Sequence, residues 1–376
     1  MVNKFYIIAG EASGDLHASN LMKAMKDQTP AIDFRFWGGD HMAQVAGKPV
    51  KHIKDLAFMG FVEVLLNLRT ILGNIKQCKE DILNYQPDAL VLVDYPGFNL
   101  RIAEWAKKQG ITVYYYISPQ VWAWKQNRVH TIKKVVDRMF VILPFEKSFY
   151  AKFDMNVDFV GHPLIDAIEQ YNTTTSKEEL LAQHTLDQRP IIALLPGSRK
   201  QEIAKKLPVM LEAIKDQRDY QIVVAGAPAQ ERFFYERFLQ DYPAVKIVHG
   251  ATYDVLRLST AALVTSGTAT LETALFKVPQ VVCYKGSPIS YAIAKRLVKI
   301  KYISLVNLIL DKEAVKELIQ SECTSANIQR ELSSILPDGI KHKQMMEDYT
   351  SLITLLGKGG ASQLTAELIL ADLRQK

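Results

Sequence analysis

The sequence predicts an α/β protein built from two doubly wound domains. Short apolar runs rich in β-branched and aromatic residues alternate with amphipathic segments along both halves of the 376 residues. Fully apolar strands separated by helices are typical of parallel sheets whose two faces are both covered. A polar stretch without periodicity at residues 171–176 interrupts this alternation. The sequence therefore indicates two sheets joined by a linker, each with its own core.

The expected elements follow this alternation in chain order. In the first half we expect strands at Phe5–Ala9, Phe34–Trp37, Ala89–Val93, Ile111–Ile117, Met139–Leu143 and Val157–Val160. Between them, helices are expected at Leu16–Met25, Val62–Leu83 and Leu100–Lys108. The second half repeats the pattern with strands at Ile191–Leu195, Gln221–Ala225, Val245–Val248, Ala261–Val264 and Gln280–Cys283. From about Leu318 onward the pattern is helical, and Ser362–Leu373 carries an apolar stripe.

These elements divide the chain into domains. We expect a first domain at residues 1–168, a linker at 169–189, a second domain at 190–345 and C-terminal helices at 346–376. In doubly wound folds, ligands bind beyond the carboxyl ends of the strands. The expected ligand site is therefore a cleft that the two domains face.

Composition excludes several classes of protein. With 48% apolar and 23% charged residues, the chain is neither disordered, collagen-like nor a coiled coil. Its three cysteines, Cys78, Cys283 and Cys323, fit neither a disulfide framework nor a paired-cysteine zinc site. We expect no metal site, since no Asp-x-Asp or His-x-x-x-His pair occurs. No secretory signal and no apolar run near the ~18 residues of a membrane span are found. The net charge of +6 permits an anionic partner without selecting one.

Two glycine turns in the second half favour a nucleotide-diphosphate site. Residues 196–199 (PGSR) and 265–272 (TSGTATLE) each follow an expected strand and open a helix. Glycine lets the backbone approach a ligand closely, helix N-termini offer free N–H groups, and arginine matches phosphate geometry. Glu272 could accept bonds from the two hydroxyls of a ribose. Ordinary turns, with a surface arginine and a capped helix, are the alternative.

Asp94 is the candidate general base of the first half. It closes the expected strand Ala89–Val93, where burial would raise its pKa toward a useful value. A loop aspartate that caps the next helix is the alternative. Residues 10–15 (GEASGD) also follow a strand but match neither Gly-x-Gly-x-x-Gly nor Gly-x-Ser-x-Gly. Their polar groups either bind an acceptor or shape the turn.

Segment 56–75 is more apolar than one buried helix face requires. It is either an ordinary core helix or a face that meets acyl chains or a membrane surface, with nearby lysines and arginines attracting anionic headgroups. The residues assigned to this contact are Phe58, Met59, Phe61, Leu65, Leu66, Leu68 and Leu72.

Six motifs resemble those of the lipid-A-disaccharide synthase family. They are residues 10–15, SPQVWAW at 118–124, GHP at 161–163, LPGSR at 195–199, SGTATLE at 266–272 and YISLVNL at 302–308. They run in order along nearly the whole chain, and the first two are specific to this family. Other glycosyltransferases of the GT-B type share only the glycine turns and the glutamate.

The resemblance implies two Rossmann-like domains of the GT-B type, with the C-terminal helix returning to the first domain. It also implies an inverting, metal-independent transfer without a cofactor. The donor would be UDP-2,3-diacylglucosamine and the acceptor 2,3-diacylglucosamine 1-phosphate, giving a β-1,6-linked disaccharide phosphate and UDP in lipid A (lipopolysaccharide) biosynthesis. Such an enzyme would lie in the cytoplasm of a Gram-negative bacterium, peripherally bound to the inner membrane. No nucleic-acid partner is implied, and a homodimer is left open.

The resemblance also implies roles for individual residues. Asp94 matches the family's essential aspartate, the base. The donor side comprises Gly197, Ser198, Arg199, Glu202, Ser266, Gly267, Thr268, Thr270, Glu272 and Asn307. The acceptor side comprises Glu11, Ser13, Gly14, Asp15, Gln120 and Trp122. Many members carry a second aspartate where this chain has Gly97, and that carboxylate is an alternative base.

Two other functions use the same observations. A UDP-N-acetylglucosamine epimerase, or a transferase acting on a soluble or polyprenyl-linked sugar, would need the same nucleotide domain; an activity on soluble sugars would need no exposed apolar segment at 56–75. A basic nucleotide-sensing or RNA-binding module has only the charge of +6 in its favour, because no basic stripe with interleaved aromatic residues occurs.

Overall fold

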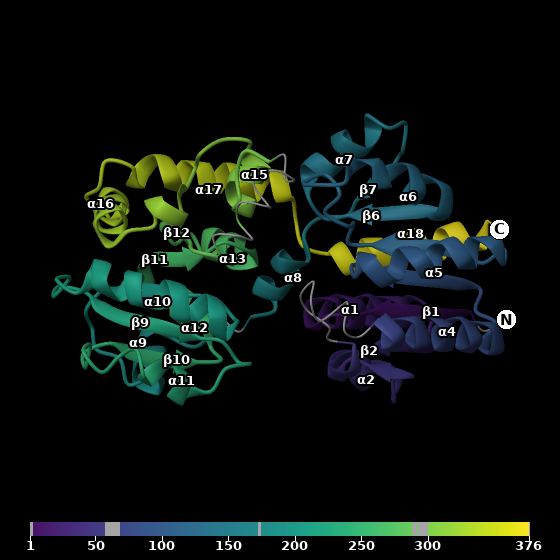
Figure 1. The fold of residues 1–376 in the computed structure, drawn as a ribbon, viewed down its shortest axis with the longest axis horizontal. Coiled ribbons are helices and arrows are strands. Elements are labelled where there is room, and N and C mark those ends of the chain that lie inside the picture. The colour runs from purple at the N-terminus through teal and green to yellow at the C-terminus, as the bar shows by residue number, and fades with distance from the viewer. Residues whose placement is uncertain (1–2, 57–67, 172–173, 288–290, 292–299, 376) are drawn as a thin grey trace. The chain divides into compact units, whose positions relative to one another are not determined.

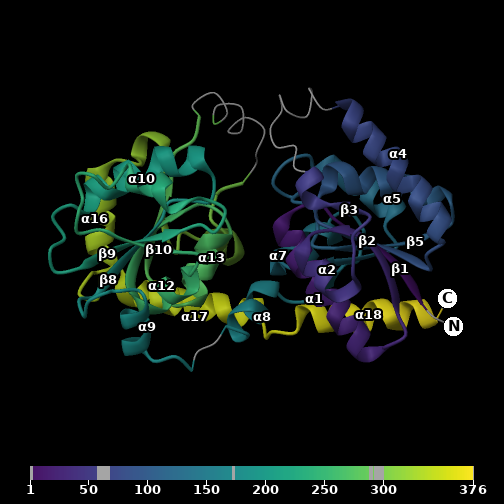
Figure 2. The ribbon, with the colours of Figure 1, turned by 90° about the horizontal axis from the view of Figure 1, so that it is seen from below.

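A computed structural model describes residues 3–56, 68–171, 174–287, 291 and 300–375. The chain forms two compact units (Figure 1). The first contains Met1–Asp166 together with Lys358–Lys376, and the second contains Ala167–Gly357. Each unit is a parallel sheet with helices on both of its faces, as Figures 1 and 2 show. This confirms the doubly wound α/β class that the alternating pattern predicts.

The described part of the first unit contains a seven-stranded sheet in the order β3-β2-β1-β4-β5-β6-β7. The strands are β1 (Lys4–Ala9), β2 (Asp33–Gly38), β3 (Lys51–His52), β4 (Ala89–Val93), β5 (Thr112–Tyr116), β6 (Arg138–Val141) and β7 (Asp158–Phe159). The helices are α1 (Ala12–Gln28), α2 (Asp40–Ala46), α4 (Leu68–Tyr85), α5 (Pro96–Lys108), α6 (Val129–Val135), α7 (Pro144–Ala151) and α18 (Ala361–Arg374), with 3-10 turns η1 (Ile53–Asp55) and η2 (Gln126–Arg128). Helix α8 (Pro163–Glu169) contains the boundary between the two units.

The C-terminal helix completes the core of the first unit. Helix α18 packs along α1, and its residues Ala366, Ile369 and Leu370 are buried in the same apolar cluster as strands β1 and β4 (Figure 2). Polar contacts tie it to the sheet as well. The Tyr114 hydroxyl donates to Asp372 over 2.6 Å, and Arg138 donates to the backbone carbonyl of Leu368 over 3.1 Å. The expected return of the chain to the first unit is thus confirmed for α18.

The described part of the second unit contains a six-stranded sheet in the order β10-β9-β8-β11-β12-β13. The strands are β8 (Ile191–Leu195), β9 (Gln221–Gly226), β10 (Lys246–His249), β11 (Ser259–Thr265), β12 (Gln280–Tyr284) and β13 (Lys316–Ile319). The helices are α9 (Lys177–Gln183), α10 (Lys200–Ile214), α11 (Arg232–Glu236), α12 (Thr252–Leu258), α13 (Thr268–Leu275), α15 (Leu305–Leu310), α16 (Ser325–Ile335) and α17 (His342–Leu356), with the 3-10 turn η3 (Gln320–Glu322).

The segment expected as a linker contains a helix of the second unit. Ser176 caps α9, because its hydroxyl accepts from the Glu179 amide over 3.2 Å and the Glu179 carboxylate accepts from the Ser176 amide over 2.8 Å. Leu180 and Leu181 of this helix are buried in the core of the second unit. Ser176, the last residue of the polar stretch, is therefore a helix start. Likewise, residue 346 lies inside α17, which packs against α13, α15 and α16, so the return to the first unit begins at 358.

Two short strands lack a sequence signature. Strand β3 has only two residues, and β13 has the sequence KELI in a region where the pattern turns helical. Glu317 of β13 is buried because its carboxylate accepts the Ile303 and Ser304 amides, each over 2.9 Å. A charged residue satisfied in this way leaves no apolar alternation to detect.

Candidate functional site

In both sheets the strand order reverses at a switch point, and two of the motifs named above lie at each switch point. In the second unit, β8 and β11 are neighbours whose registered pair Leu195–Val264 brings their carboxyl ends to one level. In the first unit, β1 and β4 end together at the pair Ala9–Val93. The chain then leaves these neighbouring strands in opposite directions, which opens a crevice for ligands. The loops at these crevices begin at residues 196, 266, 10 and 94.

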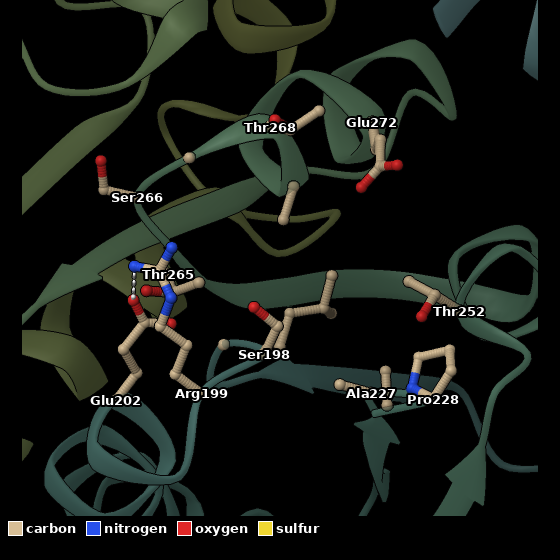
Figure 3. A pocket seen from close by; sticks show the side chains of 15 residues that line it. Ser198, Arg199, Glu202, Ala227, Pro228, Thr252, Thr265, Ser266, Thr268 and Glu272 are labelled. Atoms are coloured by element: carbon tan, nitrogen blue, oxygen red, sulfur yellow. Dashed lines mark ion pairs between the residues drawn. The ribbon is translucent and has the colours of Figure 1, made fainter. Parts of the chain in front are cut away.

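A pocket of about 430 Å³ lies at the switch point of the second unit (Figure 3). Eight of the ten predicted donor-side residues line it: Gly197, Ser198, Arg199, Glu202, Ser266, Gly267, Thr268 and Glu272. Leu195, Thr265 and Ala269, which belong to the two motifs, also line it, and the sequence reasoning missed Ala225, Ala227, Pro228 and Thr252. Ala225, Ala227 and Pro228 lie at the carboxyl end of β9, so that strand end was the available signal.

The first pocket loop has a conformation that requires glycine. Gly197 adopts φ +121°, and a Cβ atom there would lie 2.6 Å from the Glu202 carboxylate. Helix α10 begins directly after this turn, with Arg199 at its N-cap. The Arg199 guanidinium forms an ion pair with Glu202 over 3.6 Å, drawn as a dashed line in Figure 3. The turn thus presents a helix N-terminus and a guanidinium to the same pocket.

The second pocket loop is open where a ligand would approach. Gly267 adopts φ +139°, yet a Cβ atom there would meet nothing within 4 Å. As the N-cap of α13, Gly267 provides no side-chain oxygen to bind the first amides of the helix. The Ser266 hydroxyl donates to the Ile303 carbonyl over 2.8 Å, and Thr270 donates to the Gly267 carbonyl over 2.8 Å. These two side chains fix the loop, and the free helix start faces the pocket.

Glu272 provides the carboxylate of this pocket. It projects from α13 (Figure 3). The Tyr253 hydroxyl donates to its Oε1 over 3.1 Å. Burial raises the pKa of Glu272, and this hydrogen bond lowers it in part. Its remaining acceptor capacity is suited to hydroxyl groups of a bound ligand.

Asn307 is fully buried and does not line the pocket. Its amide nitrogen donates to the Val315 carbonyl over 2.8 Å and to Glu317 over 2.9 Å, while its amide oxygen accepts from the Ala314 and Val315 amides. Glu317 in turn binds the backbone at 303–304, which accepts the Ser266 hydroxyl. Asn307 therefore acts on the second pocket loop through this chain of contacts.

Asp94 lies at the switch point of the first unit, in an unusual backbone turn. Asp94 and Tyr95 adopt φ +46° and +51°, a region that residues with side chains rarely occupy. Burial and then the negative charge of Glu11 raise the pKa of Asp94 to about 6, against a hydrogen bond from the Tyr95 backbone that lowers it. A carboxylate with this pKa is a competent general base near neutral pH.

The loop after β1 supports this turn. Gly10 packs against the Tyr95 ring so closely that a Cβ atom would lie 2.3 Å from it. Glu11 and Ser13 are exposed, whereas Gly14 and Asp15 are buried. The Asp15 carboxylate accepts from the Gly39, His41 and Met42 amides at the start of α2, over 2.7, 3.0 and 3.1 Å. Asp15 thus holds the β1 and β2 loops together.

The remaining acceptor-side residues follow β5. Gln120 is exposed, and Trp122 is buried with its ring edge-on to Phe145 at 5.0 Å between centroids. Beside them, burial raises the pKa of Glu146 to about 7, although its carboxylate accepts from the Leu143 amide over 2.9 Å. A second buried carboxyl therefore lies under this loop.

The apolar segment falls largely outside the described residues. Phe58, Met59, Phe61, Leu65 and Leu66 lie outside the residues that the structure describes, as does the side chain of Leu68. Leu72 on α4 is described, and it is 54% exposed. Among the described residues, no helix combines the length and the apolar character needed to cross a bilayer. The same residues contain no cluster of three or more metal-ligating side chains.

Two doubly wound units, with a pocket at the switch point of the second, define a protein of the GT-B type. Solved structures with this fold include S. aureus MnaA with UDP (TM-score 0.70, 15% identity, covering 99% of this chain and 97% of that one). Another is the UDP-GlcNAc 2-epimerase of Neisseria meningitidis bound to UDP-GlcNAc (TM-score 0.68, 14% identity, covering 98% of this chain and 100% of that one). At these identities the likeness concerns the fold alone.

The sequence comparisons identify the family. Residues 5–370 match the family model described as lipid-A-disaccharide synthetase. The lipid-A-disaccharide synthase of Syntrophus aciditrophicus is 40% identical over 98% of this chain and 97% of its own length, and that of Geobacter metallireducens is 38% identical with the same coverage. The chain belongs to the lipid-A-disaccharide synthase family, a family of glycosyltransferases. This confirms the family that the six motifs predict.

Proposed function

We propose that the chain joins UDP-2,3-diacylglucosamine to 2,3-diacylglucosamine 1-phosphate by an inverting transfer in lipid A biosynthesis. The products are the β-1,6-linked disaccharide 1-phosphate and UDP. The observation that carries this proposal is the pocket of the second unit, which eight predicted donor-side residues line in a chain of this family.

The pocket supplies what a UDP leaving group needs. The two helix starts after Gly197 and Gly267 offer backbone N–H groups to the diphosphate, and the Arg199 guanidinium adds positive charge. Glu272 accepts hydrogen bonds from the ribose hydroxyls. Charge on the departing diphosphate is thereby stabilised by groups fixed before the reaction.

Asp94 serves the acceptor in this proposal. As the primary hydroxyl oxygen bonds to the anomeric carbon of the donor, the bond from that carbon to the diphosphate oxygen breaks. The electron pair leaves with UDP, and Asp94 takes the hydroxyl proton. Attack on the face opposite the leaving group inverts the anomeric configuration. The raised pKa of Asp94, about 6, suits this proton transfer.

The proposal also includes peripheral contact with the cytoplasmic face of the inner membrane. Leu72 is exposed on α4, and the exposed Trp124 carries Lys125 over its ring at 4.3 Å. An aromatic ring beside a cation is typical of surfaces that lie at lipid headgroups. Vesicles of anionic lipid should bind the protein, and Leu72→Glu should weaken that binding. Leu355→Glu, on an exposed leucine of α17, is the matched control.

One experiment tests the reaction. The protein is incubated with both acylated sugars, and the products are analysed by mass spectrometry and by NMR of the new linkage. We expect a β-1,6-linked disaccharide phosphate and equimolar UDP, with unchanged rates when a chelator is present. Conversion of UDP-N-acetylglucosamine to its 2-epimer, without any disaccharide, would instead identify an epimerase.

A further inference from the structure

A lysine lies buried beneath the pocket of the second unit. Lys206 is on α10, one turn after Glu202, and only 2% of its surface is exposed. Its ammonium donates to the Thr265 hydroxyl oxygen. Among the described residues Lys206 forms no ion pair with a carboxylate, and Glu202 pairs with Arg199. A buried ammonium that is not directly paired with a carboxylate is costly, so its position favours an anion bound in the pocket.

Thr265 connects this lysine to the pocket. It is the last residue of β11 and lines the pocket next to the Ser266–Gly267 turn (Figure 3). A hydroxyl whose oxygen accepts from an ammonium keeps its own proton for donation. The ammonium also polarises that hydroxyl, which makes it a stronger donor.

Several groups around the ammonium affect the Lys206 pKa. Burial lowers the Lys206 pKa, and the Glu202 carboxylate and the Cys283 and Cys323 thiols raise it, whereas the Arg199 guanidinium lowers it. Lys206 and Arg199 thus both add positive charge near this pocket, Lys206 from beneath Thr265 and Arg199 from the pocket lining.

We propose that Lys206 and Thr265 form a donor pair for the diphosphate of the bound nucleotide. Thr265 donates its hydroxyl proton to a phosphate oxygen, and Lys206 positions and polarises that hydroxyl from below. Lys206 is thus a positioning residue that makes the pocket selective for a nucleoside diphosphate over the nucleoside. This inference rests on the proposed function, because it concerns the same pocket.

Calorimetry with UDP and with uridine tests the inference. Lys206→Met keeps the length and the apolar stem of the side chain but removes the charge. We expect it to weaken UDP binding about ten-fold and to leave uridine binding unchanged. Lys205→Met removes the same charge from an exposed position on the same helix and is expected to change neither affinity. With the acylated substrates, Lys206→Met should raise the KM of the donor and leave that of the acceptor unchanged.

A second variant guards against a folding defect. Thr265→Val keeps the shape of the side chain and retains Lys206, and it should weaken UDP binding to a similar extent. The double variant should lose little more than either single one, because both act through one hydroxyl. Unchanged UDP affinity in Lys206→Met, or an equal loss for UDP and uridine, would overturn the inference. If the unsubstituted protein does not bind UDP, the proposed function itself fails.

Discussion

The hydroxyl of Tyr115 donates a 2.6 Å hydrogen bond to the backbone carbonyl of Asp94. The Asn99 amide donates to the same carbonyl over 2.7 Å. Two donors on one carbonyl fix the orientation of the peptide that follows Asp94. They thereby support the positive φ of Asp94, a backbone conformation that costs energy. The position of the Asp94 carboxylate is therefore fixed from the backbone side, by residues of β5 and α5.

Tyr115→Phe should lower kcat without affecting the nucleotide. The substitution removes one of the two donors, so the Asp94 turn loses part of its support, and unfolding free energy should fall by about 1 kcal/mol. We expect several-fold slower turnover with unchanged UDP affinity, measured by steady-state kinetics and calorimetry. An unchanged kcat would show that the Asn99 bond is sufficient.

Asp94→Asn should abolish the acid limb of the pH profile. A general base works when deprotonated, so kcat/KM of the unsubstituted enzyme should rise as pH increases through about 6 and level off above it. In Asp94→Asn we expect at least a ~100-fold lower kcat and no such limb. UDP affinity should stay the same, because the pocket lies in the other unit. Normal turnover in this variant would remove Asp94 from the mechanism.

Gly97→Asp should be tolerated and should move the acid limb to higher pH. A Cβ atom at Gly97 meets nothing within 4 Å, and a carboxylate in the first turn of α5 suits the helix dipole. Its negative charge adds to that of Glu11 and should raise the Asp94 pKa further. Gly97→Asn, of the same size but neutral, should leave the limb in place. Restored turnover in Asp94→Asn/Gly97→Asp would show that position 97 can carry the base.

Gly267→Ala should destabilise the protein although it creates no clash. Only glycine readily adopts φ +139° with ψ −162°, so we expect a loss of about 1–3 kcal/mol in unfolding free energy and weaker UDP binding. Gly73→Ala is the matched control. Gly73 lies inside α4 with equal space for a Cβ atom, and there alanine should stabilise the protein by about 0.5–1 kcal/mol. Effects of equal sign would contradict the conformational explanation.

Asn307→Ala and Arg199→Ala should both reduce activity, but for different reasons. Asn307→Ala leaves buried amides and Glu317 without a partner and should lower the melting temperature together with turnover. Arg199→Ala removes a largely exposed side chain and should weaken UDP binding while the melting temperature stays unchanged. Thermal unfolding and calorimetry of the two variants separate these cases. A melting temperature of Asn307→Ala equal to that of the unsubstituted protein would contradict the role of its network.

The sequence predicts most of the fold because its strands are buried on both faces. Strands β4 and β8 have the sequences ALVLV and IIALL, and all their residues are buried. Strand β13 escapes detection because Glu317 is satisfied by backbone amides rather than by solvent. Helix α9 is missed because its capping residue follows a run of threonines that is typical of a loop.

The site was predictable to the extent that its residues follow strands. Arg199, Gly267 and Glu272 come directly after β8 and β11, so spacing alone brings them to one pocket. The contacts of Asn307 could not be predicted from its position relative to a strand, because its partners Ala314, Val315 and Glu317 meet it only in the folded structure. Lys206 gives no signal either, since a lysine on an amphipathic helix is ordinarily solvated.

The position of α18 affects how the chain acquires its structure during translation. This helix contributes Ala366, Ile369 and Leu370 to the core of the first unit, although it is synthesised after the whole of the second. Until α18 is synthesised, the apolar side chains of the first unit that it covers, including those of α1, lack this partner. Residues 167–357 can already fold into the second unit by then. The first unit therefore completes its core only when translation reaches the end of α18, and its uncovered apolar surface is accessible to chaperones until then.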